Sequence, residues 1–526
     1  MTRIIHRYIF RDLFKVFILT TLSMTLIFSI SQMLRPIQKY GVAPEQVFKL
    51  LWYFSPVMLS FVMPIAAVFA ASITYGRFAS DNEFDACRAS GISPHSLAMP
   101  GLVLAVFVAV CNLLLNFYIS PVYIDKAERS IQANAREIIF RSLERNGYYE
   151  NKNGRFKIMS DVVLPEENRL LGVNILEQRK NKSGWLVTTP EAQVEIDTHR
   201  HYNNIVAVAH DAYYIDGKTQ GYSRRLPVMG RFGSLLGEKV KFLKYDELTE
   251  VKDNPYLFNP VREKVLEVSD QLSAELFSEY ISRSLSDNGR FELFTPARRL
   301  VVHCGGAEAQ NKSTIRLLGE VKTVEYDKLL AERMIKTWAG REAFLRLDAD
   351  RSWVLSMPSA VWKSPDGIEG LAADHNMRGI SMPAELEDLF SEENILHTVM
   401  NEHPDEPTEE LKTLHTRVKD KIVDVYANIH AEIHFRIVFA IGCISLVITG
   451  MALGIIYKGG HVLTAFGLSS IPAGFLIVVI AAGENITKNV PSGAESFSYN
   501  GIYLMWAGLG VLMLISGLVY RRINHA

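Results

Sequence analysis

The sequence predicts an α-helical membrane protein: six transmembrane helices, three before and three after a large extracytoplasmic β-rich domain, jellyroll-like, that carries an α/β insertion. Between the two groups of helices lies a polar stretch, 125–436, that holds most of the charged side chains. Each apolar run is uncharged and long enough for a helix to cross about 30 Å of hydrocarbon. The runs cover about 16–34, 50–76, 97–119, 437–457, 462–483 and 502–520.

The composition of the whole chain hides this division. With 48% hydrophobic residues, 21% charged residues and a net charge of −1, the chain resembles an ordinary soluble protein. The near-neutral balance gives no reason to expect a nucleic-acid partner. Of the four cysteines only Cys304 lies in the polar stretch, so that stretch has no internal disulfide and needs an ordinary apolar core.

Four segments follow from these patterns. They are a membrane part at 1–124, a β-jellyroll-like domain at 125–248, an inserted α/β region at 249–420 and a second membrane part at 421–526. Short β-rich runs separated by turn residues predict an antiparallel sandwich or a jelly roll. The runs lie at 156–159, 171–176, 185–189, 192–196 and 204–209. The insertion combines a helix predicted over 261–288 with further strands, and the acidic stretch 401–410 is typical of a linker.

Lys and Arg near the membrane ends indicate the orientation, because cytoplasmic loops carry an excess of both. The outer loops hold few of them, including Arg35, Lys39 and Lys488. We therefore expect a multi-pass protein of the cell inner membrane, with both termini cytoplasmic and the large domain periplasmic. The inner segments would then hold nine: Arg3, Arg7, Arg11, Lys15, Arg77, Arg88, Lys458, Arg521 and Arg522. The first run is too long for a cleaved signal peptide, and no small-residue cleavage site follows it.

The loop between the second and third apolar runs has the most specific local sequence. It predicts a short helix over 81–91, with Ser80 or Asp81 as N-cap and Gly91 as the C′ stop. Acidic residues lie in its first turn and Arg88 near its end, which complements the helix dipole. A short rigid helix outside the membrane can dock into a partner and transmit its movement. A solvated connecting helix is the alternative.

This region resembles the LptF/LptG (YjgP/YjgQ) family of lipopolysaccharide-export permeases. The resemblance rests on Leu59-Ser-Phe-Val-Met-Pro64, Gly76-Arg-Phe78 and Glu83-x-x-Ala86-x-Arg88-Ala89-x-Gly91. It extends to Arg7-Tyr-Ile-Phe-Arg11 near the start and to Glu432-Ile-His434-Phe-Arg436 before the fourth run. The layout of three spans on each side of a domain is also the family's. Together the similar parts cover roughly 1–240 and 420–526.

The resemblance implies a transmembrane permease subunit of an ATP-driven exporter. Such a subunit extracts lipopolysaccharide or a related glycolipid from the inner membrane toward a periplasmic bridge protein. In the family the loop helix couples to a cytoplasmic ABC ATPase (LptB-like) dimer, which implies a docking surface formed by Glu83, Ala86, Arg88 and Gly91. The resemblance also implies a second six-helix permease, a paralogue or a second copy. We expect no cofactor and no ATP hydrolysis by this chain itself.

Basic residues at the outer membrane boundary are candidates for contact with lipid phosphates. Arg35 and Lys39 follow the first span, and Arg129 and Arg136 follow the third. In the family, basic residues of these two regions contact lipid phosphates, which implies the same role here. The alternative is that they mark the boundary and meet ordinary lipid headgroups.

Other motifs give weaker indications of chemistry. The stretch 306–313 imitates a phosphate loop, but Asn311 stands where the loop needs Gly before Lys312. His430 and His434 could ligate a metal, but no third ligand is evident, so a helix entering the membrane is favoured. No catalytic set is found, so we predict neither catalytic nor metal-binding residues. The spans hold no Asp, Glu, Lys or Arg, which argues against a self-powered secondary transporter.

A second class of function remains open. The insertion at 249–420 makes the outer domain longer than the family's, and the resemblance assigns it no role. A membrane-anchored scaffold or sensor whose periplasmic domain binds a protein partner is therefore the alternative.

Overall fold

The computed structural model describes residues 2–40, 44–133, 135–150, 156–179, 182–198, 203–216, 219–232, 239–310, 313–327, 333–347, 351–457 and 462–522. The chain divides into two compact units. The first comprises Met1–Thr249, Ala427–Asn489 and Ser498–Ala526, and the second comprises Glu250–Tyr426 and Val490–Phe497.

Within the described residues, six helices are long and apolar enough to cross a membrane by length and composition. Together with the β-rich part, they confirm the predicted fold class. The third span continues through a π-helical turn, η1, and the fourth belongs to a helix that begins well before the apolar run. The helices of the first unit are α1 (Thr2–Tyr40), α2 (Pro44–Ser80), α3 (Glu83–Ala89), α4 (Pro94–Leu114), η1 (Leu115–Ile119), α5 (Ser120–Ala133), α6 (Ala135–Asn146), the 3-10 turn η2 (Val240–Phe242), α12 (Val462–Lys488) and α13 (Asn500–Arg522), while α7 (Tyr245–Asp253) and α11 (Glu409–Ile456) run across both units.

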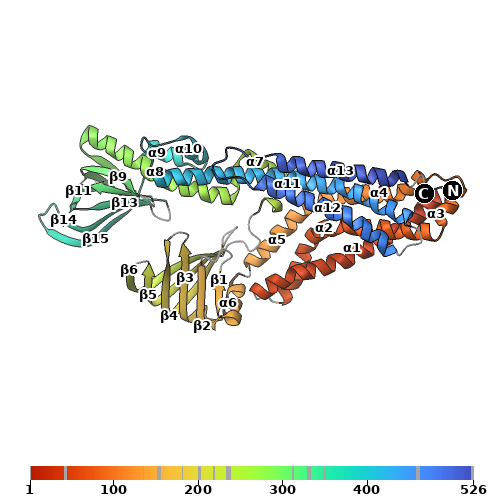
Figure 1. Ribbon diagram of the computed structural model, residues 1–526. Helices are drawn as coiled ribbons and strands as arrows, with labels where there is room; N and C mark the ends of the chain where they lie inside the picture. Colours follow the sequence, from red (N-terminus) through yellow and green to blue (C-terminus); the bar gives the residue numbers. More distant parts are fainter. Residues whose placement is uncertain are drawn as a thin grey trace. The chain divides into compact units, whose positions relative to one another are not determined.

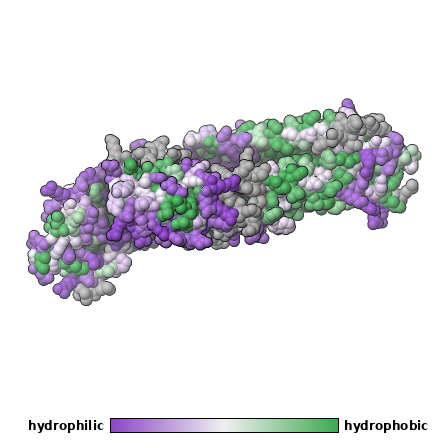
Figure 2. Space-filling model, turned by 90° about the horizontal axis from the view of Figure 1, so that it is seen from below, coloured by the Kyte–Doolittle hydropathy of each residue, from purple (hydrophilic) through white to green (hydrophobic). Residues whose placement is uncertain are grey.

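The surface of the helical bundle is apolar along its length and polar at one end. Figure 2 shows hydrophobic residues over the bundle and a hydrophilic group at its end. In Figure 1 this end carries the start of α1, the end of α13 and the short helix α3. The bundle thus has the distribution of polarity that a membrane-embedded part requires.

Glycines allow α11 to pack closely against α2. A Cβ atom added at Gly450 would lie 2.9 Å from the carbonyl oxygen of Val68, and one at Gly454 would lie 2.8 Å from that of Ser72. The Ser72 hydroxyl donates to the Gly450 carbonyl at 3.1 Å. The two backbones are therefore in direct contact, as small residues permit in membrane helices.

The β part of the first unit is one antiparallel sheet whose six strands follow chain order and curl (Figure 1). Its core contains Ile139, Phe140 and Leu143 of α6, which pack with alternate residues of the strands such as Val173 and Ile175. Alternation is the pattern of a sheet with one covered face. The strands are β1 (Tyr148–Glu150), β2 (Phe156–Leu164), β3 (Arg169–Arg179), β4 (Lys182–Thr198), β5 (Asn203–Asp216) and β6 (Thr219–Phe232).

One strand differs from the prediction. The runs 185–189 and 192–196 were expected to be separate strands because Pro190 lies between them, but both belong to β4. The ladder to β5 keeps its register here, with Thr188 opposite Tyr213 and Glu191 opposite His210, but Thr189 and Pro190 between them have no ladder partner in β5. A proline is tolerated in a strand where the pairing is locally disrupted.

The second unit contains a nine-stranded antiparallel sheet and the long helix α8 (Asn259–Asn288), which confirms the helix predicted over 261–288. Phe277 and Ile281 of α8 are fully buried in the core of this sheet, and the Phe277 ring meets the Trp353 ring edge-on at 5.3 Å. The remaining elements are η3 (Pro255–Leu257), β7 (Phe291–Phe294), β8 (Arg298–His303), β9 (Gly306–Gln310), β10 (Thr314–Leu318), β11 (Val321–Asp327), β12 (Met334–Gly340), β13 (Ala343–Leu347), β14 (Trp353–Lys363), β15 (Glu369–Ile380), α9 (Ala384–Glu387), η4 (Asp388–Phe390) and α10 (Ile395–Asn401).

Replacing Gly454 by Ala should destabilise the bundle, because the added methyl would meet the Ser72 carbonyl. Overpacking of this kind costs about 1–3 kcal/mol. We expect a lower melting temperature of the detergent-solubilised protein. The matched control is Gly474→Ala in α12, where nothing lies within 4 Å of the added atom, so an equal loss for both variants would contradict the packing.

The second unit should lose stability in acid. Burial, and then the nearby Arg298 and Lys336, lower the pKa of His375 to about 4. In the unfolded chain the histidine has a pKa of about 6.5. Between that pH and about 4 the unfolded state therefore binds a proton that the folded state does not bind. Stability is therefore complete above the pKa of the unfolded state and falls as the pH drops toward 4. We expect the melting temperature to fall between about pH 7 and about pH 5, and His375→Gln to reduce this fall. His303→Gln, at an exposed position, is the control, and an equal effect of both variants would contradict the assignment.

Candidate functional site

The short helix α3 begins two residues later than predicted. The prediction of Ser80 or Asp81 as N-cap is wrong, because α2 continues through Ser80 and the Asp81 N–H donates to the Arg77 carbonyl at 2.9 Å. The cap position is held by Asn82, with φ of 59° in the left-handed region. Asn tolerates this conformation better than most residues, so a sharp turn separates the two helices.

The end of α3 agrees with the prediction for Gly91. This residue has φ of 84°, and its N–H donates to the Arg88 carbonyl at 2.9 Å, while the Ile92 N–H donates to the Cys87 carbonyl at 3.1 Å. These two bonds form a Schellman motif, which stops a helix at a residue in the left-handed conformation. The connection from α3 to α4 is therefore defined by hydrogen bonds.

One aromatic side chain holds α3 against the bundle. Phe84 is 3% exposed and meets the Phe78 ring edge-on at 6.3 Å. Cys87 packs at the edge of the same core, where burial and then the Glu83 carboxylate raise the pKa of its thiol. The opposite side of α3 is exposed at Ala86 and Ala89. The helix thus presents a flat surface of small side chains.

Polar contacts tie neighbouring helices together at this end of the bundle. Arg77 of α2 forms an ion pair with Asp12 of α1. His6 of α1 lies 3.0 Å from the Ser96 hydroxyl of α4. His95 of α4 hydrogen-bonds the Tyr520 hydroxyl of α13 at 2.8 Å. These non-covalent contacts connect the four helices α1, α2, α4 and α13 at the end of the bundle that carries α3.

The four residues predicted for docking lie together on and next to α3. Ala86 and Gly91 are exposed, whereas Glu83 and Arg88 are partly covered. Glu83 lies in the first turn of the helix and Arg88 in its last turn. A partner meeting this surface would therefore contact small residues flanked by one charge of each sign.

The residues predicted to meet lipid phosphates differ in what they contact. Arg35 and Lys39 lie in the last part of α1, and their side chains lie outside the described part of the structure. Arg129 forms an ion pair with Asp125 at 2.9 Å, with both side chains more than half exposed. Arg136 donates to the Pro165 carbonyl at 2.7 Å.

Arg136 lines an open depression of about 470 Å³ beside α6. Two arginines and three glutamates surround it, so its charge is mixed rather than positive. Arg141 is already paired with Glu137 at 2.6 Å. The depression is lined by Arg136, Glu137, Phe140, Arg141, Glu144, Pro165 and Glu166.

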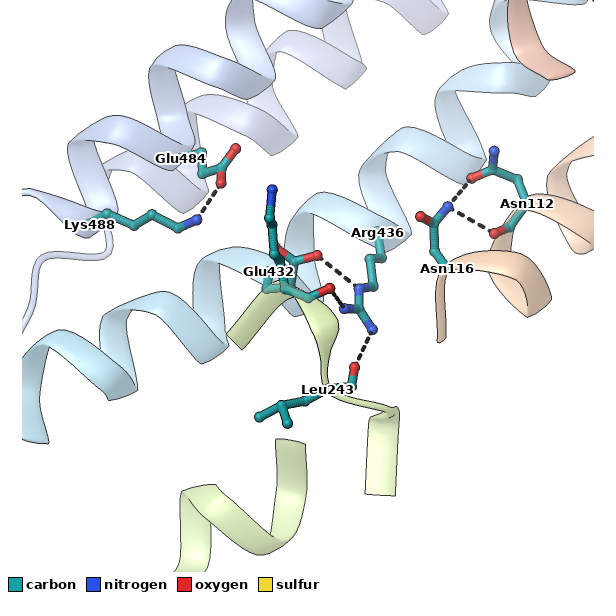
Figure 3. Close-up of polar contacts among 8 residues, drawn as sticks. Asn112, Asn116, Leu243, Glu432, Arg436, Glu484 and Lys488 are labelled. Carbon is teal, nitrogen blue, oxygen red and sulfur yellow. Dashed lines mark hydrogen bonds and ion pairs between the residues drawn. The ribbon is translucent and has the colours of Figure 1, made fainter. Parts of the chain in front are cut away.

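A buried polar site surrounds Arg436 at the start of the fourth apolar run (Figure 3). Arg436 belongs to the motif Glu432-Ile-His434-Phe-Arg436, for which the sequence predicted no role. The Arg436 side chain is 1% exposed, and its Nε donates to Glu432 at 2.9 Å. Nη1 donates to the Leu243 carbonyl at 3.1 Å and Nη2 to the Lys241 carbonyl at 2.9 Å. The guanidinium also lies 5.1 Å from the centre of the Phe117 ring. Two signals of this site were present in the sequence, namely the spacing of Glu432 and Arg436 by four residues and their place in a motif of the resemblance, but neither indicated the contacts with residues 241–243.

Next to this site, two asparagines satisfy backbone groups of the membrane helices. Asn112 is fully buried, and its amide donates to the Ser60 carbonyl at 2.5 Å. That carbonyl lacks its usual helix donor because Pro64, four residues later, has no N–H. Asn116, in the π-helical turn, donates to the backbone and side-chain oxygens of Asn112 at 3.0 Å and 2.9 Å.

The stretch 306–313 and the histidine His434 have ordinary structural roles. Gly306–Gln310 is the strand β9, and Asn311 and Lys312 lie outside the described residues. His434 accepts a hydrogen bond from the indole of Trp506 in α13 at 3.2 Å. Within the described residues no group of three or more possible metal ligands is found.

A sequence model of the family "Lipopolysaccharide export system permease LptF/LptG" matches residues 7–207. The match covers the first three apolar helices, α3 and the six-stranded sheet as far as β5. The match supports membership of the LptF/LptG permease family. No curated protein matches the chain. The resemblance seen in the sequence is thus confirmed over residues 7–207, and its part at 420–526 stays a prediction.

Membership of the LptF/LptG family, with the six apolar helices, indicates a multi-pass protein of the inner membrane. It implies a permease role in lipopolysaccharide export. The family consists of permease subunits, generally without catalytic activity, which work in an ABC transporter complex with partner proteins.

Replacing Phe84 by Ala should loosen α3, because its one deeply buried side chain is lost. A buried Phe→Ala change costs about 3–5 kcal/mol. We expect faster hydrogen exchange of the backbone amides in 83–92, measured by mass spectrometry on the purified protein. Ala89→Ser at an exposed position is the control, and unchanged exchange in Phe84→Ala would show that the ring does not anchor the helix.

Proposed function

We propose that the chain is the transmembrane permease subunit of an ATP-driven exporter. It extracts lipopolysaccharide or a related glycolipid from the inner membrane and passes it toward a periplasmic bridge protein. ATP is hydrolysed by a separate cytoplasmic ABC ATPase dimer that docks on α3. A second six-helix permease completes the membrane part of the complex.

The observation that carries this proposal is the construction of α3. A seven-residue helix has too few hydrogen bonds to persist by itself in water. Here the helix is held by Phe84 and by the Schellman motif at Gly91, and polar contacts connect the helices beneath it. The outer surface of α3 stays exposed. Such a helix transmits a push from a partner to the membrane helices instead of bending away.

The orientation and the lipid contacts belong to the same proposal. With the α3 end in the cytoplasm, both termini lie there, and the sheet and the second unit are periplasmic. The distribution of Lys and Arg supports this orientation. Arg35, Lys39, Arg129 and Arg136 are the candidates for contact with lipid phosphates. Because Arg129 is already paired with Asp125, a lipid phosphate would have to compete with that carboxylate.

A scaffold or sensor is the second candidate function. The second unit lies outside the family match and has a sheet, a long helix and an apolar core of its own. A protein-binding role of this unit is compatible with export by the first. The two functions are separated by lipid mass spectrometry of the protein purified in mild detergent, since a scaffold would bring no bound lipopolysaccharide.

Reversing the charge of Arg88 or Glu83 should weaken docking of the ABC ATPase encoded in the same genome. We expect less co-purified ATPase and lower ATP hydrolysis by the complex for Arg88→Glu and Glu83→Lys, because charges at the rim of an interface steer association. The control is Arg522→Glu, an exposed arginine at the end of α13. Unchanged binding and activity in both α3 variants would count against the docking assignment.

A further inference from the structure

We propose that Arg436 is a positioning residue that fixes the chain segment 241–243, which follows the six-stranded sheet, to the fourth membrane helix α11. The inference rests on the proposed function, because it concerns how movement of the helices reaches the part of the chain that would receive the lipid. It assigns Arg436 no contact with lipid.

The guanidinium of Arg436 forms its hydrogen bonds with other groups of the protein. Each of the three guanidinium nitrogen atoms donates a hydrogen bond, one to Glu432 in the same helix and two to the carbonyls of Lys241 and Leu243. With 1% of its side chain exposed and the Phe117 ring beside it, the guanidinium has no open face for a lipid phosphate. A buried charge is tolerated only when it is paired and hydrogen-bonded in this way.

The segment held by Arg436 has a second attachment. Tyr245, at the start of α7, meets the Phe117 ring edge-on at 5.4 Å. Phe117 therefore lies between the guanidinium and this tyrosine, and it belongs to the π-helical turn η1 of the third span. Turns of this kind are rare and are frequently found at functional sites.

Several ionic groups surround the segment. Burial, and then Lys239, lower the pKa of Lys241, and Glu432, Lys488 and Glu484 also act on it. Glu484 and Lys488 form an ion pair of their own at the end of α12 (Figure 3). Ionic groups of the segment, of α11 and of α12 therefore lie close together.

The contacts continue from Arg436 toward α3. Asn116 immediately precedes Phe117 in the third span and donates a hydrogen bond to Asn112. The Asn112 amide in turn donates to the Ser60 carbonyl of α2. The end of α2 leads directly into the turn before α3. These contacts connect residues 241–243 with Ser60 of α2, and the helix α2 itself connects Ser60 with α3. Such a set of contacts carries coupling only where it changes position, and this requires a direct test.

The test compares variants that separate charge from geometry. Arg436→Lys keeps the charge but loses the planar fork that reaches two carbonyls. Arg436→Gln leaves Glu432 buried without its partner and can fail to fold. The double variant Arg436→Met with Glu432→Met removes both charges, and such replacements of buried pairs often fold well. Arg290→Gln, at an exposed arginine of the second unit that the proposed lipid contacts do not include, is the control.

Two measurements are made on each variant. The first is hydrogen exchange of the backbone amides in 240–248 of the purified chain, which does not depend on any transport activity. The second uses the complex with its ABC ATPase in lipid vesicles that contain lipopolysaccharide. It records ATP hydrolysis together with light-induced cross-linking of lipid to a photoreactive residue at position 214, where Tyr214 packs against the core of the six-stranded sheet.

We expect faster exchange in 240–248 for Arg436→Lys and for the double Met variant. We also expect continued ATP hydrolysis but about tenfold less lipid adduct, a typical size for a coupling free energy. Wild-type exchange in the double variant, or full recovery of lipid adduct by Arg436→Lys, would overturn the positioning role. If the wild-type complex yields no lipid adduct while the exchange result holds, the proposed function fails and the attachment of 241–243 stands.

Discussion

The carbonyl of Ser60 shows the constraint on which the membrane part depends. Pro64 leaves this carbonyl without a helix donor, and a membrane interior offers no water to replace it. The amide of Asn112 fills the gap from the neighbouring helix. Tyr75 likewise bonds to backbone groups of a neighbouring helix. Its hydroxyl accepts a hydrogen bond from the Gly101 N–H at 3.0 Å and donates one to the Leu97 carbonyl at 3.1 Å. Polar side chains inside the bundle therefore sit where backbone groups need them.

These contacts have a mechanical consequence. Tyr75 and Asn112 join α2 to α4 at two levels, and α3 is the connection between the same two helices. A displacement of α3 is therefore expected to move α2 and α4 together, since sliding one past the other would strip hydrogen bonds from buried groups. The direct backbone contact of Gly450 and Gly454 with α2 adds α11 to this body. Rigidity of this kind is what the proposed coupling through α3 requires.

The sequence predicted what depends on composition and on local turns. The apolar runs and the stop at Gly91 were visible because a membrane span needs length and a Schellman motif favours glycine. The N-cap was placed wrongly because only the structure shows that α2 continues through Ser80. Arg129 was predicted to meet lipid phosphates from its place at the membrane boundary, and that prediction did not consider Asp125, four residues earlier in the same helix. The partners of Arg436 lie up to 195 residues away, beyond any local pattern.

The buried pair of Arg436 and Glu432 poses a question of energy. A buried ion pair contributes little to stability relative to apolar residues of similar volume, since taking two charges out of water offsets their attraction. The guanidinium contributes a geometric constraint. Its N–H donors lie in one plane at fixed angles, and their acceptors belong to two separate segments of the chain. A lysine would supply the same charge without that geometry. The choice of arginine at this position therefore favours a role in fixing where residues 241–243 lie over a role in strengthening the fold.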